Sequence, residues 1–209
     1  MRVIRKAFPE DANEFAELAL IAAPYFPVLF GKKIRTVLQY LFCQPRNLFS
    51  HEHTCFAEID SQRAGMILSY DWRAKAEEDL RTGLLFMTLM KFNFLARLPL
   101  LLKFNKAVGG VKKGESYISN VATYSRYRGL GVGGSLIAAA EHEAQKGGAK
   151  KIVLDVEKEN VNAIGLYERL GYEITRESSV RLGGEVIVDS YRMAKTLFDN
   201  GDRIGILRP

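Results

Sequence analysis

The sequence predicts a mixed α/β fold, in which a central sheet carries helices on its faces. Short segments at residues 54–59, 117–123 and 151–156 are rich in β-branched and aromatic residues, which is typical of strands. Residues 132–146 carry apolar side chains every three to four positions, which is typical of an amphipathic helix. Strands and helices that alternate in this way favour helices packed on one sheet.

The first half of the chain begins with a predicted strand at residues 3–7. A helix follows after Pro9, ends before Pro24 and Pro27 because proline interrupts helices, and is succeeded by a second helix at residues 32–42. Two further strands are expected at residues 54–59 and 64–72, joined by a polar hairpin loop at residues 60–63.

The second half is predicted to alternate strand and helix and then to close with two strands. The expected strands lie at residues 117–123, 151–156, 172–180 and 185–194, and the expected helices at residues 132–146 and 163–170. Gly147 and Gly171 follow the two helices, where a glycine commonly ends a helix. Gly183 and Gly184 supply the turn between the last two strands.

Residues 73–113 do not fit this minimal pattern, and we interpret them as an apolar helical insertion in one domain of residues 1–209. A membrane span needs about 20 uninterrupted apolar residues, and Lys91, Asn93, Arg97 and Pro99 interrupt this stretch. The simplest interpretation is one or two helices packed on the sheet or on another subunit. A lid over an apolar pocket and contact with a lipid surface remain as alternatives.

Composition narrows the class of protein. The chain is 47% hydrophobic and 26% charged, as ordinary globular proteins are. Its charge of +6 is spread in pairs such as Lys150–Lys151 rather than in tracts, which argues against nucleic-acid binding and suits a polyanionic cofactor. With two cysteines and no apolar leader after Met1, we expect a cytoplasmic protein without a disulfide framework.

The most informative segment is the glycine run at residues 127–135, which lies between a predicted strand and a predicted helix. Glycines at positions 129, 131, 133 and 134 allow a tight bend and bring main-chain N–H groups close to a ligand. The positive end of the following helix dipole favours an anion there. The segment therefore predicts a phosphate or pyrophosphate site.

Two families of ligand could supply that anion. Gly129-x-Gly131-x-x-Gly134 with Asp155 matches the dinucleotide fingerprint, but it lies past the middle of the chain and no second βαβ half follows. Arg128-x-x-Gly131-x-Gly133 instead closely resembles the acetyl-CoA-binding motif of the GNAT N-acetyltransferase superfamily. Asn160-x-x-Ala163-x-x-Leu166-Tyr167-x-x-x-Gly171-Tyr172 is similar to the second signature of that family.

The resemblance implies a mostly antiparallel sheet of six to seven strands, with the insertion placed before the cofactor-binding strand. It implies transfer of an acetyl group from acetyl-CoA to a primary amine of a small molecule or peptide, by direct attack in a ternary complex. It implies Tyr167 as the acid that protonates the departing thiolate. The residues it implies for cofactor binding are Val121, Ala122, Thr123, Arg128, Gly129, Leu130, Gly131, Val132, Gly133, Gly134, Ser135 and Asn160.

The residues leave several roles open. Asn160 could instead only cap a helix, and Asp155, Glu157, Glu115 or a water relay could serve as the base. His51, His53 and Cys55 alternate as on one strand face, but no further ligand cluster supports zinc, so no metal is expected. A homodimer, a non-catalytic acyl-CoA sensor and a nucleotide-binding redox module are the remaining alternatives.

Overall fold

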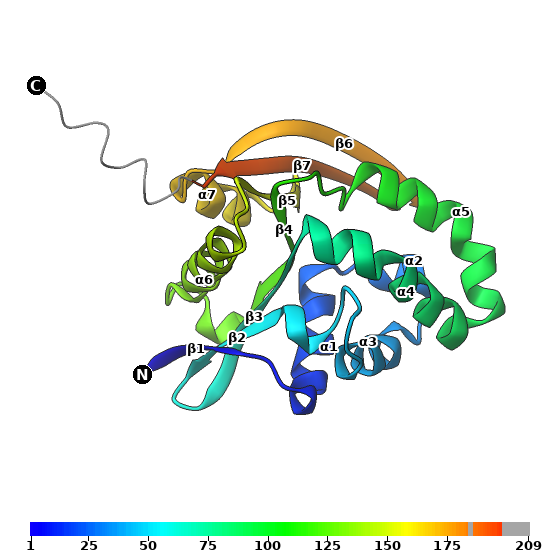
Figure 1. Ribbon diagram of the computed structural model, residues 1–209, viewed down its shortest axis with the longest axis horizontal. Coiled ribbons are helices and arrows are strands. Elements are labelled where there is room, and N and C mark those ends of the chain that lie inside the picture. The colour runs from blue at the N-terminus through cyan, green and yellow to red at the C-terminus, as the bar shows by residue number, and fades with distance from the viewer. Residues whose placement is uncertain (184–185, 198–209) are drawn as a thin grey trace, which may run out of the picture.

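The computed structural model describes residues 1–183 and 186–197, which form a seven-stranded sheet (Figure 1). The strand order is β1-β2-β3-β4-β5-β7-β6, and every neighbouring pair is antiparallel except β4 and β5. This arrangement confirms the predicted mixed, mostly antiparallel sheet. The strands are β1 (Arg2–Lys6), β2 (Thr54–Ile59), β3 (Gln62–Asp71), β4 (Glu115–Thr123), β5 (Lys151–Glu157), β6 (Glu173–Gly183) and β7 (Val186–Thr196).

Helices cover both faces of the sheet. The α-helices are α1 (Ala12–Ala22), α2 (Phe26–Phe30), α3 (Ile34–Cys43), α4 (Trp72–Met90), α5 (Phe92–Ala107), α6 (Val132–Lys146) and α7 (Val161–Arg169). Side chains alternate across β3, so Met66 and Leu68 pack into the core beneath α1 to α5, while Ile67 packs into the core beneath α6 and α7. The sheet therefore separates two apolar cores.

The insertion forms two helices, which is one of the two arrangements expected from the sequence. Asp71 begins α4, because its side chain accepts hydrogen bonds from the N–H groups of Arg73 and Ala74 at 3.0 and 2.9 Å. Lys91, with φ of +50°, separates α4 from α5.

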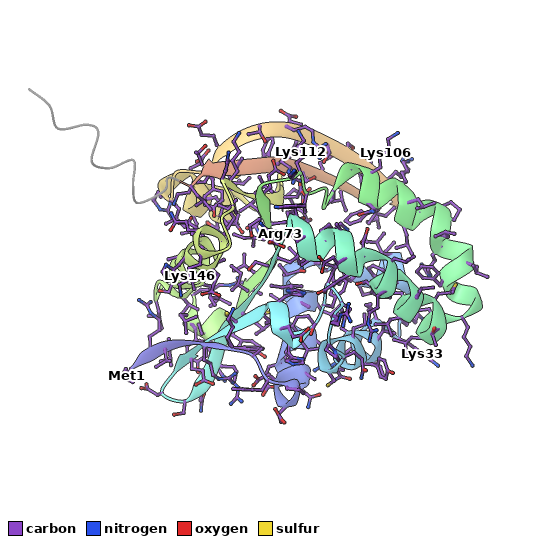
Figure 2. All side chains as sticks on the ribbon, viewed as in Figure 1. Met1, Lys33, Arg73, Lys106, Lys112 and Lys146 are labelled. Atoms are coloured by element: carbon purple, nitrogen blue, oxygen red, sulfur yellow. The ribbon has the colours of Figure 1, made fainter. Side chains whose placement is uncertain are left out.

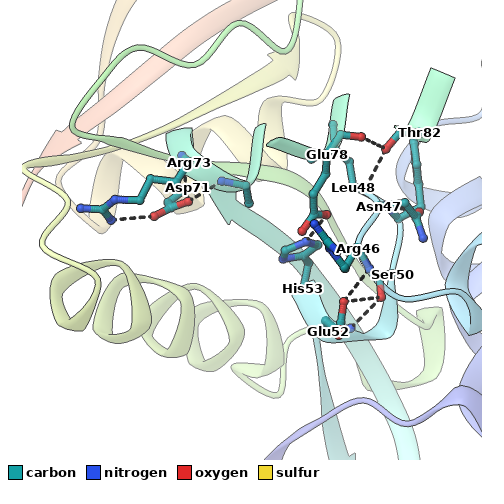
Figure 3. A network of polar contacts seen from close by, with 12 residues as sticks. Arg46, Asn47, Leu48, Ser50, Glu52, His53, Asp71, Arg73, Glu78 and Thr82 are labelled. Atoms are coloured by element: carbon teal, nitrogen blue, oxygen red, sulfur yellow. Dashed lines mark hydrogen bonds and ion pairs between the residues drawn. The ribbon is translucent and has the colours of Figure 1, made fainter. Parts of the chain in front are cut away.

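Contacts with residues 46–53 anchor α4 (Figure 3). The N–H of Leu48 donates to Oγ1 of Thr82 at 2.9 Å, and Nε2 of His53 lies 2.8 Å from Oε2 of Glu78. His51 and His53 belong to a 3₁₀ turn (His51–His53), so the expectation that they share a strand face with Cys55 is wrong. Within the described chain no group of potential ligands is arranged to hold a metal ion.

A buried carboxylate ties the N-terminal strand to the hairpin. Asp11, 1% exposed, accepts hydrogen bonds from Arg5 Nη1 and Nη2, Arg63 Nε and Nη2, and the N–H of Phe8, at 2.7 to 3.1 Å. Burial alone opposes ionisation, but these donors outweigh it and hold the pKa of Asp11 well below its usual range.

Some boundaries differ from the prediction. The proline-containing segment expected to separate two helices forms the short helix α2. Pro27 lies in the first turn of α2, where a backbone N–H has no partner within the helix, so the missing N–H of proline costs no hydrogen bond. Trp72 was expected to end a strand but begins α4. Gly184 and Glu185, expected in a turn and at the start of a strand, lie outside the described residues.

Candidate active site

The two parallel strands at the centre of the sheet separate before they end. β4 and β5 pair only from Glu115 opposite Lys151 to Ile118 opposite Leu154, although β4 continues to Thr123 and β5 to Glu157. On its other edge β4 has a bulge, because Leu68 and Ser69 of β3 pair with Asn120 and Ile118 and leave Ser119 extra. The separated ends flank a cleft of about 670 Å³.

The free edge of β4 presents main-chain groups to this cleft. The N–H of Tyr124 donates to the carbonyl of Ala64 on β3 at 3.0 Å. Main-chain groups of successive strand residues point to opposite edges, so those of Val121 and Thr123 point away from β3, where β5 no longer pairs. An unpaired edge of this kind can accept an extended ligand as an added strand.

The glycine run bends into the start of α6 at the mouth of the cleft. Gly129 and Gly131 have φ of +78° and +74°, in the left-handed region that glycine adopts without strain. Gly131 is the N-cap of α6, and the N–H of Ser135 donates to its carbonyl at 3.2 Å. The N–H groups of Val132, Gly133 and Gly134 precede the first intrahelical bond and are therefore available to an anion.

A contact distant in sequence holds this loop. Arg2 of β1 donates from Nη1 to the carbonyl of Leu130 at 2.7 Å. Nη1 also lies 3.0 Å from the position that a Cβ on Gly131 would take. The loop is thus held in a defined conformation by a side chain from the N-terminal strand.

The cleft brings together most of the residues expected to bind the cofactor. Leu130 and Ser135 do not line it: Leu130 is exposed, and Ser135 uses both its N–H and its Oγ on the carbonyl of Gly131. The expected residues that line the cleft are Val121, Ala122, Thr123, Arg128, Gly129, Gly131, Val132, Gly133, Gly134, Asn160 and Tyr167.

Helix α7 contributes two of these residues. Oδ1 of Asn160 accepts a hydrogen bond from the N–H of Ala163 at 3.2 Å, so Asn160 caps the helix. Its amide nitrogen is not needed for the cap. Tyr167 is 5% exposed, and burial raises the pKa of its hydroxyl well above the usual range. The hydroxyl is therefore protonated at neutral pH.

Asp155, which also lines the cleft, is the centre of a network that the sequence pattern did not indicate. Oδ2 of Asp155 accepts from the N–H of Gly109 at 2.9 Å, from the hydroxyl of Tyr117 at 3.1 Å and from Nη1 of Arg192 at 3.1 Å. Arg192 also donates to the carbonyl of Gly110. The segment after α5 is thereby fixed to β5 and β7 beside the cleft.

Glu157 differs from the other carboxylates considered as bases. Burial, and then the neighbouring Glu159, raise the pKa of Glu157, which lines the cleft. Asp155 is held by Arg192, and its side chain is 3% exposed. Glu115 accepts from the N–H of Lys112 at 2.9 Å and does not line the cleft.

Known proteins of one family resemble this chain. The model of the acetyltransferase (GNAT) family matches residues 15–172. A mycothiol acetyltransferase of Corynebacterium aurimucosum is 42% identical over 67 residues, which are 32% of this chain. That match spans only about a fifth (21%) of the length of the curated relative.

Solved structures share the fold over nearly the whole chain. The crystal structure of an acetyltransferase aligns with a TM-score of 0.69 and 19% identity, over 94% of this chain and 100% of the other. The Salmonella typhimurium protein yncA, whose structure contains its cofactor acetyl-CoA, aligns with a TM-score of 0.60 and 16% identity, over 95% of each chain. At these identities the likeness concerns the fold alone.

Proposed function

This chain belongs to the acetyltransferase (GNAT) family, and we propose that it transfers the acetyl group of acetyl-CoA to a primary amine in a ternary complex. The amine belongs to a small molecule or a peptide. One observation carries the proposal. The free N–H groups at the start of α6 and the separated ends of β4 and β5 open into the same cleft.

The residues at the mouth of the cleft fit the diphosphate of coenzyme A. The N–H groups of Val132, Gly133 and Gly134 would hold it together with the positive end of the α6 dipole. Among the described residues, no heavy atom of another segment lies within 4 Å of where a Cβ on Gly129 or Gly134 would be, so a ligand can approach the main chain there. Arg128 also lines this part of the cleft and adds positive charge.

The edge of β4 would hold the pantetheine arm of the co-substrate. Val121 and Thr123 offer main-chain groups along that edge, and Asn160, at the N-cap of α7, lines the same cleft. Acetyl-CoA brings an acyl group already activated as a thioester. A main-chain N–H near Ala122 and Thr123 would polarise the thioester carbonyl, as preorganised amides do in other acyl transfers.

Tyr167 would donate the proton that the departing thiolate needs. Tyr167 lines the cleft, and its burial keeps the hydroxyl protonated. The nearby hydroxyl of Tyr172 is not part of the cleft lining. Protonation by a positioned acid typically contributes about 10²- to 10⁴-fold to a rate.

We assign Glu157 as the proton acceptor for the attacking amine, directly or through water. The raised pKa of Glu157 makes its carboxylate a ready proton acceptor, whereas Oδ2 of Asp155 already accepts hydrogen bonds from Gly109, Tyr117 and Arg192. The need for this base depends on the amine. Deprotonating a lysine-like amine at pH 7 costs about 4.6 kcal/mol, but an α-amine costs only about 1 kcal/mol.

Titration calorimetry with acetyl-CoA, coenzyme A and NAD tests the choice of ligand. Binding of NAD without binding of coenzyme A would refute an acetyltransferase. A free-thiol assay with acetyl-CoA and a panel of amines, amino acids and peptide N-termini then tests the reaction. Release of thiol that depends on an acceptor supports catalysis, whereas binding with no turnover across the panel would favour an acyl-CoA sensor.

A further inference from the structure

Helix α5 has an exposed apolar face that the chemistry of the cleft does not use. Phe94, Leu100, Leu101, Phe104 and Ala107 pack inward against the core of the helical face. On the opposite side of the helix, Leu95 is 53% and Leu102 is 62% exposed, and Pro99, Lys103 and Lys106 are exposed between or beside them. At 100° per residue these five residues form one outward stripe, which we call the α5 face.

Helix α4, which precedes α5, also exposes apolar side chains to solvent. Leu80, Leu84 and Met87 of α4 are exposed at a spacing of four and three residues, while Thr82, Phe86 and Met90 of that helix are buried. Soluble proteins usually turn polar residues outward on a surface helix. Both helices of the insertion therefore carry aliphatic outward stripes.

The charged residues of the segment that contains α5 all have one sign. The 35 residues from Leu80 to Gly114 contain no Asp or Glu and seven Arg or Lys residues. Of these, Arg81, Lys91, Lys103, Lys106, Lys112 and Lys113 are exposed. Exposed leucines flanked by cations, with no acid among them, are the pattern of helices that lie on anionic lipid surfaces.

We propose that the α5 face docks on the surface of a membrane that contains anionic lipids. The leucines would enter the boundary between headgroups and acyl chains, and Lys103 and Lys106 would contact lipid phosphates. None of the helices in residues 1–183 and 186–197 is long and apolar enough to cross a bilayer, so the contact proposed is peripheral. A nucleic acid would use the lysines but would leave the leucines exposed, and a second copy of this chain would bring the same positive charge to the contact.

The test is sedimentation of the full chain with vesicles at low and high salt. We expect the protein to bind vesicles made from an equal mixture of phosphatidylglycerol and phosphatidylcholine, and to bind vesicles of phosphatidylcholine alone more weakly. Binding to the mixed vesicles should be lost as salt screens the charges. Each basic residue near an anionic surface contributes about fivefold to the partition coefficient. The double variant K103E/K106E should therefore lower partitioning by about 25-fold or more.

Matched variants separate this face from general charge or hydrophobicity. K146E/K150E makes the same change of net charge at the end of α6, and Figure 2 shows Lys146 across the molecule from Lys106. This variant should keep most of the binding. L95S/L102S should lower partitioning about tenfold, whereas I174S/I187S, which removes two exposed side chains from β6 and β7, should not.

Three results would overturn the proposal. The first is equal binding to neutral and anionic vesicles, or binding to neither. The second is an equal loss of binding in the α5 variants and in their controls. The third is a dimer, measured by light scattering, that L95S/L102S converts to a monomer, because the α5 face would then be covered by a second copy. Thermal unfolding of every variant checks that each one is folded.

Discussion

Ile118 of β4 and Leu154 of β5 are the last residues that pair across the centre of the sheet. Beyond them β4 and β5 no longer pair with each other, so the sheet contains an opening bounded by the facing edges of these two strands. The main-chain groups of Val121 and Thr123 face this opening from one side, and Asp155 and Glu157 lie along the other. We propose that acetyl-CoA and the amine meet in this opening.

Replacing Tyr167 with Phe removes the proposed acid while keeping the ring that packs in the core. We expect kcat for acetyl transfer to fall by about 100-fold or more, with the Kd for acetyl-CoA nearly unchanged. Acceptor-dependent thiol release and calorimetry measure the two quantities. Tyr172→Phe is the matched control, because its ring lies 5.7 Å from that of Tyr167 and its hydroxyl is also buried. Equal activity of the two variants would remove the assignment of Tyr167.

Gly131→Ala places a Cβ on a left-handed residue at the start of α6. Gly148→Ala introduces the same strain, with φ of +73°, just after the other end of that helix. Both substitutions should cost about 1–2 kcal/mol of stability. Only Gly131→Ala should weaken binding of coenzyme A, by tenfold or more, because it disturbs the amides proposed to hold the diphosphate. An equal Kd in the two variants would place the diphosphate elsewhere.

Glu157→Gln should slow the reaction without destabilising the fold. The pKa of Glu157 is raised, which means that its ionised form is disfavoured in the folded state. Ionisation of Glu157 therefore lowers the free energy of unfolding as the pH rises from about 4.3 through the folded pKa. The variant should therefore unfold at the same or a higher temperature at pH 7.

The kinetic effect of Glu157→Gln should depend on the acceptor. We expect a decrease in kcat of about 100-fold for a lysine-like amine and a smaller decrease for an amine with a lower pKa. In the parent protein the rate should fall at low pH as Glu157 becomes protonated. A variant that keeps this acidic limb and full activity would show that another group accepts the proton.

Asp11→Asn tests the buried ion pair that joins β1 to β3. Removing the charge leaves Arg5 and Arg63 with Glu58 as their shared carboxylate and should cost about 3 kcal/mol of unfolding free energy at pH 7. Because the folded pKa of Asp11 is depressed, its contribution is complete above the unfolded pKa of about 3.9 and is lost as pH falls toward the folded value.

Urea unfolding of the parent and of Asp11→Asn between pH 7 and pH 2 measures this difference. The gap between the two proteins should narrow as the solution becomes acidic. Asp60→Asn is the control: its side chain is 80% exposed and pairs with the N-terminal amine, so its effect should stay within about 0.5 kcal/mol. A gap for Asp11→Asn that does not change with pH would contradict the ion-pair account.

Local features of the site could be predicted from the sequence. The glycine run and the start of α6 depend on residues that are adjacent in the chain, and the left-handed conformations at Gly129 and Gly131 require that residue type. The cap by Asn160 is likewise local and was one of its two expected roles. Periodicity correctly gave the strands that form the centre of the sheet.

Contacts between distant parts of the chain could not be predicted in this way. Asp155 meets Arg192 and Gly109 across 37 and 46 residues, and Arg2 meets Leu130 across 128 residues. The end of the β4–β5 pairing and the bulge at Ser119 depend on the register between strands, which is set by the whole sheet. The short helix α2 was not predicted, because Pro24 and Pro27 argue against a helix in the whole segment around them.

The most direct test is a crystal structure of the protein with acetyl-CoA. We predict the diphosphate on the N–H groups of Val132, Gly133 and Gly134, the arm along Val121 to Thr123 between the two separated strands, and the sulfur beside Tyr167. Density for acetyl-CoA at any other place, or an opening between β4 and β5 that stays filled by the protein's own side chains at saturating ligand, would contradict this account.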